Sequence, residues 1–135
     1  MKQITLKDYL MGRDYQYPQE LTDELRANAV ETCRRTNLLL DRYFADNPDD
    51  ETGVNSGWRP AAINRGTPGA AKKSLHMVCK AIDLEDDEGA IDDWCMNNLH
   101  VLEELELWLE HPSATKGWCH LQTVPPRSKN RVFYP

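Results

Sequence analysis

Residues Cys79–Leu84 read CKAIDL, a stretch that alternates in the way expected of a β-strand. Side chains two residues apart on a strand point to the same face, so Asp83 would share a face with Cys79 and Ala81. Both of those neighbours are small. The pattern therefore predicts a strand on which a carboxylate stands where another backbone or a ligand can approach closely.

A second stretch, Trp118–Thr123 (WCHLQT), is also predicted to be a strand and ends at Pro125-Pro126. It would turn Cys119 and His120 to opposite faces of a sheet. Shorter strands are expected near Val54–Trp58, Leu107–Leu109 and Arg131–Tyr134.

The segment Leu21–Ala45 has the apolar spacing of a helix, with Thr22 as its N-cap and Asn47-Pro48 as its stop. Two shorter helices are expected, one starting near Gly89 and one covering Leu99–Leu105. Helices packed on a small antiparallel sheet make an α+β fold. We expect one domain over residues 1–135, in which residues 1–20 form an extended N-terminal segment with a possible short docking helix.

The formal net charge of −6 argues against a general nucleic-acid-binding protein, which needs a basic face to neutralise phosphates. No apolar run approaches the roughly 20 residues that span a bilayer, so no membrane contact is expected. The N-terminus lacks the apolar centre of a signal peptide. We therefore expect synthesis in the cytoplasm without a secretory signal. The oligomeric state is left open.

The four cysteines, Cys33, Cys79, Cys95 and Cys119, contain no CxxC pair, which argues against a structural zinc knuckle. We expect them to be reduced thiols that pack as small hydrophobic side chains.

Two of the four histidines, together with one carboxylate, form a candidate metal-binding set: His76, Asp83 and His120. Two imidazoles and one carboxylate suit zinc, and three protein ligands leave a fourth position for water, as in catalytic zinc sites. Their spacing alone is weak evidence. The alternative is an exposed loop histidine, a solvated aspartate and a strand histidine packed against Trp118.

The wider sequence resembles the family of zinc D-alanyl-D-alanine carboxypeptidases and phage L-alanyl-D-glutamate endopeptidases. Three segments match in order: SGWR at residues 56–59, the signature Ser-x-His…x-Ala-x-Asp at residues 74–83, and Trp-x-His at residues 118–120. The resemblance covers roughly residues 54–122. It implies a Hedgehog/DD-peptidase-like fold and a zinc-dependent peptidase.

The resemblance also implies roles for single residues. His76, Asp83 and His120 would bind Zn²⁺. Arg59 would pair with a substrate carboxylate, which suits the geometry of a guanidinium group, the alternative being a surface cation. Ser74 would donate or accept a hydrogen bond near the substrate, although it could simply be a loop or cap residue.

Two positions depart from the family pattern. Cys79 stands where the first signature usually has glycine, and Gly117 stands where many members carry the catalytic glutamate. The general base must then come from elsewhere, and we expect Glu110, which follows a predicted strand and precedes the loop that returns to His120. Asp86 and Asp87 are the next candidates. The glutamates at 103, 104 and 106 are more easily explained as a solvated helix face.

The implied substrate is the stem peptide of peptidoglycan, cleaved at a terminal D-Ala–D-Ala bond or within the stem. A phage or prophage lysis protein (an endolysin) or a virion component is expected, acting at the cell wall after release or as part of a particle with other virion proteins. The alternatives are a non-catalytic zinc-containing wall-binding module and a structural virion module. A thiol hydrolase that uses Cys119 is disfavoured because His120 points to the opposite face.

Overall fold

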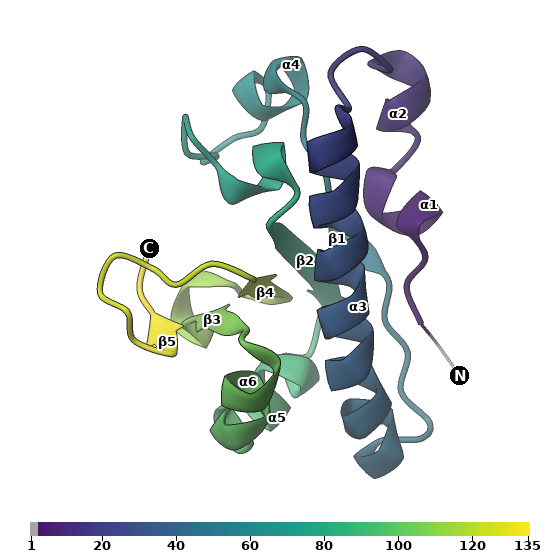
Figure 1. Ribbon diagram of the computed structural model, residues 1–135. Coiled ribbons are helices and arrows are strands. Elements are labelled where there is room, and N and C mark those ends of the chain that lie inside the picture. Colours follow the sequence, from purple (N-terminus) through teal and green to yellow (C-terminus); the bar gives the residue numbers. More distant parts are fainter. Residues whose placement is uncertain (1–2) are drawn as a thin grey trace.

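The computed structural model describes residues 3–135. Within them lie thirteen elements, among them one long helix and the five strands of a single sheet (Figure 1). In chain order they are α1 (Leu6–Leu10), α2 (Arg13–Gln16), α3 (Asp23–Asp46), β1 (Val54–Ser56), α4 (Ala61–Arg65), η1 (Leu75–Val78), β2 (Ala81–Asp86), α5 (Ala90–Met96), α6 (Leu99–Leu105), β3 (Trp108–Glu110), η2 (Pro112–Ala114), β4 (Gly117–Gln122) and β5 (Val132–Phe133).

Helix α3 supplies much of the core. The Thr22 side chain caps its first turn by accepting a hydrogen bond from the Leu25 amide, and Asn47 ends it. Its buried side chains recur every three or four residues, which turns one face of the helix toward the sheet: Ala29, Thr32, Cys33, Thr36, Leu39, Leu40, Tyr43 and Phe44.

The five strands form one sheet in the order β1-β2-β4-β3-β5. Strands β1, β2, β4 and β3 pair antiparallel, whereas β5 pairs parallel to β3. The α+β class is confirmed, but the sheet is mixed rather than purely antiparallel. The reason is the loop of residues 123–131, which carries the chain from β4 past β3 to the outer edge.

The two faces of the sheet differ. Ile82 and Leu84 of β2 and Cys119 and Leu121 of β4 are fully buried in the core shared with α3. The intervening side chains of both strands therefore point to the other face, where Asp83 and His120 stand. The expected opposite orientation of Cys119 and His120 is confirmed. All four cysteines are buried free thiols, as predicted.

The N-terminal segment is not simply extended. It contains the short helices α1 and α2, and α1 begins at a capping box in which Thr5 and Asp8 bond each other's backbone amides. Residues 1–2 of this segment lie outside the described residues. Within residues 3–135, no helix combines the length and apolarity that crossing a bilayer requires.

Candidate metal centre

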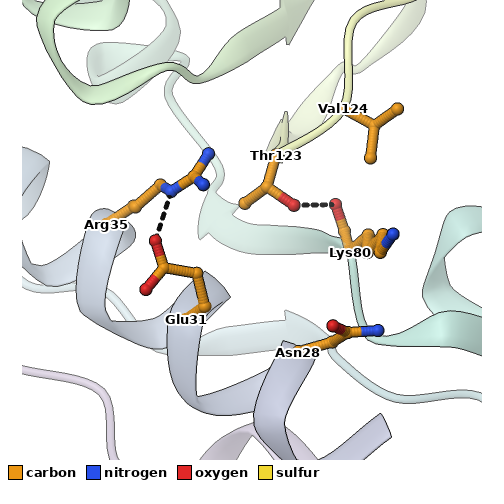
Figure 2. A pocket seen from close by; sticks show the side chains of 6 residues that line it. All are labelled: Asn28, Glu31, Arg35, Lys80, Thr123 and Val124. Carbon is orange, nitrogen blue, oxygen red and sulfur yellow. Dashed lines mark hydrogen bonds and ion pairs between the residues drawn. The ribbon is translucent and has the colours of Figure 1, made fainter. Parts of the chain in front are cut away.

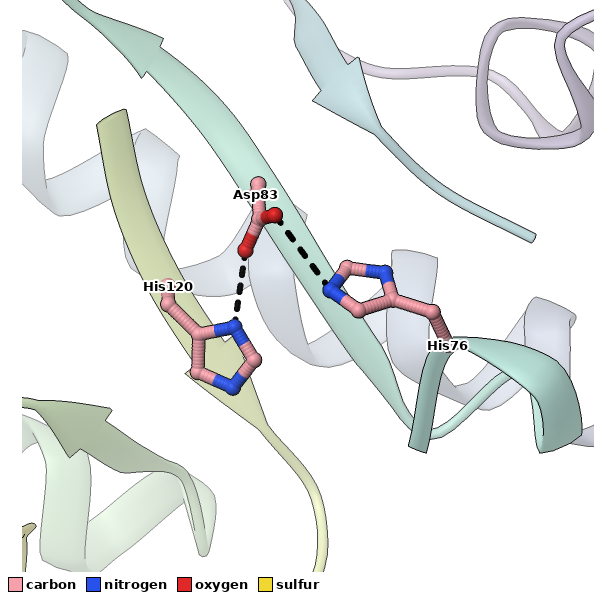
Figure 3. A group of neighbouring side chains, drawn as sticks. All are labelled: His76, Asp83 and His120. Atoms are coloured by element: carbon pink, nitrogen blue, oxygen red, sulfur yellow. Dashed lines mark hydrogen bonds and ion pairs between the residues drawn. The ribbon is translucent and has the colours of Figure 1, made fainter. Parts of the chain in front are cut away.

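Asp83, His120 and His76 converge on one point (Figure 3). Asp83 and His120 are direct partners across the β2–β4 ladder, and Asp83 Oδ1 lies 2.7 Å from His120 Nδ1. His76 approaches from η1, with Nε2 3.3 Å from Asp83 Oδ2. One carboxylate thus holds an imidazole with each oxygen, and the three predicted ligands meet although they come from three separate elements.

Hydrogen bonds to Ser74 and Gly57 hold His76 in place. The Ser74 side chain caps η1 by accepting a hydrogen bond from the His76 amide, and His76 as a whole is 2% exposed. His76 Nδ1 lies 2.9 Å from the carbonyl oxygen of Gly57. A carbonyl can only accept, so Nδ1 carries the proton and Nε2 is the nitrogen that faces the cluster.

His120 has the complementary arrangement. Gln122 donates through its amide nitrogen to the Val124 carbonyl, at 2.8 Å, which turns Gln122 Oε1 toward His120 Nε2 at 2.9 Å. The Nε2 proton of His120 therefore points at Gln122. Nδ1 is left to face Asp83 and any ion that the cluster holds.

The cluster is largely shielded from solvent. Burial alone would raise the pKa of Asp83, but hydrogen bonds and charge from His120 and His76 outweigh it and hold that pKa well below its ordinary value. Burial would lower the pKa of His120, yet the hydrogen bond with Asp83 raises it. The carboxylate is therefore ionised, as a metal ligand must be.

The donor set fits a zinc ion. One ligand atom from each residue lies within 4.8 Å of the other two, so small side-chain movements would let all three reach one ion at roughly 2.0–2.2 Å. Each imidazole uses its second nitrogen on a protein acceptor, which is the usual outer arrangement of zinc-binding histidines. Three ligands leave room for water or substrate.

Glu110 lies beside the cluster. Strands β3 and β4 pair Trp108 with Gln122 and Leu109 with Leu121, so one further step places Glu110 opposite His120. Directly opposed residues share a face of the sheet, which puts Glu110 on the face that carries His120 and Asp83. Burial raises the pKa of Glu110 above its ordinary value, with His120 opposing and Asp83 reinforcing the shift.

The other carboxylates considered from sequence lie elsewhere. Asp86 is buried and accepts hydrogen bonds from the amides of Ile91 and Asp92, so it caps α5. Asp87 is exposed, as are Glu103, Glu104 and Glu106. Glu104 forms an ion pair with Arg42 at 2.6 Å, which agrees with the solvated helix face predicted for that segment.

Arg59 and Ser74 are neighbours. Arg59 Nη2 donates to Ser74 Oγ at 3.1 Å, and the Arg59 amide donates to the His76 carbonyl. Arg59 is only 9% exposed, and its Nε has no hydrogen-bond partner in the part of the chain that the structure describes. Ser74 caps η1, which is one of the two interpretations that the sequence left open, and it also accepts a hydrogen bond from Arg59.

Both departures from the family pattern sit at left-handed backbone positions. Cys79 has φ of +60° where η1 turns into β2, a conformation that glycine adopts freely and that costs other residues on the order of 1 kcal/mol. Gly117 has φ of +100° at the start of β4. A glutamate at 117 would be strained on this backbone, which agrees with a base supplied from elsewhere.

A polar surface hollow lies apart from the cluster (Figure 2). It is lined by Asn28, Glu31, Arg35, Lys80, Thr123 and Val124. The Arg35 guanidinium is already bound to Glu31 at 2.7 Å, so its charge is neutralised within the hollow. None of its lining residues is one of the three candidate metal ligands.

Comparison with known proteins adds one finding. A family model for peptidase M15 matches residues 18–108, which is well over half of the chain. The chain belongs to the peptidase M15 family. Peptidases of this family are metallopeptidases, usually zinc-dependent, in agreement with the resemblance stated from sequence. Comparison with curated proteins and with solved structures gave no match.

The matched M15 region contains His76 and Asp83 but ends before Glu110 and His120. The second imidazole, His120, and the neighbouring carboxylate, Glu110, are therefore placed by the sheet register and not by the family model. Sequence reasoning missed Gln122. Its signal was its position two residues after His120 on a predicted strand, which places both on one face.

Proposed function

We propose that this M15 peptidase hydrolyses amide bonds of peptidoglycan stem peptides with a zinc ion held by His76 Nε2, Asp83 and His120 Nδ1. The observation that carries the proposal is the convergence of these three donors beside Glu110, on the face of the sheet that α3 leaves uncovered. Stem peptide is the substrate class to which the family resemblance points.

Bound zinc would polarise the scissile carbonyl and make a water molecule acidic enough to act as a nucleophile near neutral pH. Glu110 accepts a proton from the attacking water as the new C–O bond forms. It then delivers this proton to the amine nitrogen as the C–N bond breaks. Its raised pKa suits the first step, because a carboxylate with a higher pKa is a stronger base than an ordinary glutamate.

Arg59 and Ser74 supply the substrate-binding part of the proposal. The guanidinium of Arg59 keeps a buried Nε without a partner among residues 3–135, and its interaction with Asp83 indicates that the two groups are close. A substrate carboxylate held by Arg59 would orient the peptide over the cluster. Ser74 Oγ accepts from both Arg59 and the His76 amide, which leaves its own proton for the substrate.

The alternative function, a zinc-containing module without catalysis, is motivated by Gly117 in the position of the usual glutamate. Glu110 argues for catalysis because it supplies a half-buried carboxylate next to His120. A phage lysin and a virion component would use the same site. Detection of the chain in purified phage particles distinguishes these two settings.

The proposal is tested by incubating zinc-loaded protein with purified peptidoglycan and identifying the released fragments by mass spectrometry. We expect cleavage at one type of stem-peptide bond, and the fragment masses identify that bond. His120→Ala should lose zinc and activity together. Full activity after complete removal of the metal by a chelator, or intact wall material with the zinc-loaded chain, would contradict the proposal.

A further inference from the structure

The N-terminal helices pack against two segments that carry candidate site residues. The amide of Trp58 donates to the Tyr9 carbonyl at 3.1 Å, and the Tyr9 hydroxyl donates to the carbonyl of Ala81 on β2 at 2.7 Å. Gly57 permits this contact, since a Cβ on it would lie 1.9 Å from the Tyr9 carbonyl oxygen. Helix α1 is thus fixed against both the Gly57–Arg59 segment and the strand that carries Asp83.

This docking brings Arg13, the first residue of α2, to the same segment. Arg13 Nη1 donates to the Trp58 carbonyl at 2.7 Å. The preceding carbonyl, of Gly57, binds His76, and the following residue is Arg59. Three consecutive residues therefore connect one candidate metal ligand and two guanidinium groups.

Neither arginine forms a direct ion pair among residues 3–135, although the charge of Asp83 acts on Arg59 from a greater distance. Across residues 3–135, no carboxylate oxygen lies within 4.0 Å of Arg13 or Arg59 nitrogen atoms. Both groups are partly or largely buried. Burial lowers the pKa of Arg13, and the charge of Arg59 lowers it further, so the two cations repel each other.

Two partly desolvated like charges without a direct ion-pair partner destabilise the free protein, and an anion between them would relieve that cost. A carboxylate is the anion that a peptidase substrate offers, and two guanidinium groups can bind its two oxygens with charge-assisted hydrogen bonds. Arg13 also donates to a backbone carbonyl, which fixes one end of the guanidinium and leaves its other N–H groups for a ligand.

We propose that Arg13 is a second substrate-binding residue, which together with Arg59 grips one free carboxylate of the peptide and thereby makes the site select acidic over amidated stem peptides. This inference rests on the proposed function, because it extends the substrate side of the same site. Arg13 comes from outside every segment that carried the family resemblance in the sequence, and from outside the matched region of the family model.

The test compares two pairs of synthetic peptides. The first pair is the acid acetyl-L-Lys-D-Ala-D-Ala and the same peptide with a C-terminal amide. The second pair is L-Ala-γ-D-Glu-L-Lys-amide, whose D-Glu has a free α-carboxylate, and the same peptide with D-isoglutamine in place of D-Glu. Binding to the zinc-loaded Glu110→Gln protein is measured by calorimetry, so that no turnover interferes. We expect the acid of one pair to bind at least tenfold more tightly than its amide.

Adding Arg13→Gln should reduce this acid-over-amide ratio about tenfold, and Arg13→Lys should restore part of it. An unchanged zinc content and circular dichroism spectrum would verify that the variants fold. Arg26→Gln, which removes an exposed charge on α3, is the matched control and should leave the ratio unchanged.

Two results would overturn the inference: no acid preference in the parent protein, or the same preference after Arg13→Gln. Cleavage of peptidoglycan by the unmutated chain is measured separately. If cleavage occurs and the Arg13 variants bind as the parent does, the inference fails while the proposed function stands. If no peptide bond is cleaved, the proposed function fails whatever the peptides bind.

Discussion

Gln122 decides which nitrogen of His120 faces the other candidate metal ligands, Asp83 and His76, through the 2.9 Å contact between Gln122 Oε1 and His120 Nε2. The amide cannot flip without turning its nitrogen away from the Val124 carbonyl, 2.8 Å away. Gln122 is 6% exposed, so water offers it little alternative. Gln122, two residues after His120 on β4, thus orients the His120 imidazole, a role that neighbouring acceptors commonly have in zinc sites.

Replacement of Gln122 by methionine should weaken zinc binding by about 10- to 100-fold, because it removes the acceptor for His120 and keeps a similar side-chain length. Gln122→Glu keeps an acceptor and should bind zinc nearly as the unmutated chain does. Competition with a chromogenic chelator at pH 7.5 measures both affinities. Equal affinities of the methionine variant and the parent would show that Gln122 has no orienting role.

Glu110→Gln should retain zinc and lose turnover by roughly 10²- to 10⁴-fold, the usual effect of removing a general base. The exposed helix residue Glu103 offers a matched control, and Glu103→Gln should leave the rate unchanged. Metal content and initial rates on the fragment identified from peptidoglycan are the measurements. A Glu110→Gln protein with normal rates would mean that another carboxylate is the base.

The pH profile of the same reaction gives a separate check on Glu110. Its carboxyl must be ionised to accept a proton, and burial raises its pKa. Activity should therefore fall as the pH drops through that raised pKa, at a higher pH than the ordinary glutamate value of about 4.3. The measurement is kcat/KM at constant zinc saturation. An acid limb at or below pH 4 would contradict the assignment.

The regular elements follow closely from sequence patterns. Helix α6 was expected over Leu99–Leu105 and has those bounds, because Asn97-Asn98 interrupts the preceding helix and the apolar spacing then restarts. Strands β2 and β4 followed from alternation, and their pairing brings Asp83 opposite His120. Spacing alone was weak evidence for the candidate ligands; the resemblance to a known family singled them out.

Long-range packing accounts for what the sequence did not reveal. Arg13 reaches the Trp58 carbonyl beside Arg59 because Gly57 lets α1 approach, a contact between residues far apart in the chain. The parallel pairing of β5 likewise depends on the path of the loop over residues 123–131 and not on any local preference. Neither contact leaves a periodic pattern in the sequence.

Gly57→Ala should destabilise the protein by about 1–3 kcal/mol, the range typical of forced overpacking. The added Cβ would meet the Tyr9 carbonyl oxygen at 1.9 Å, so α1 or the segment that holds His76 must shift. Gly66→Ala is the control, because its Cβ would meet only ordinary contacts, the nearest at 3.7 Å. Urea unfolding of the zinc-free proteins measures both. Equal stabilities would mean that α1 is not packed as described.

Asp92 of α5, which is not part of the candidate metal site, makes the free energy of unfolding depend on pH. It is 2% exposed, accepts a hydrogen bond from Thr115 Oγ1 at 3.0 Å, and has a second buried oxygen without a hydrogen-bond partner among residues 3–135. Burial raises its pKa to about 6. In the unfolded chain the pKa returns to roughly 3.9.

A carboxyl whose pKa is higher in the folded state stabilises the protein when it is protonated. That contribution is fully present below about pH 4 and is lost as the pH rises through about 6, where the folded protein must bury a charge.

Asp92→Asn stays neutral and can still accept from Thr115. It should therefore exceed the parent in free energy of unfolding at pH 7.5, by on the order of 1 kcal/mol, with the difference closing near pH 4. The exposed neighbour provides the control, Asp93→Asn, which should show no such trend in urea unfolding. A difference between Asp92→Asn and the parent that is the same at both pH values would mean that Asp92 keeps its ordinary titration in the folded chain.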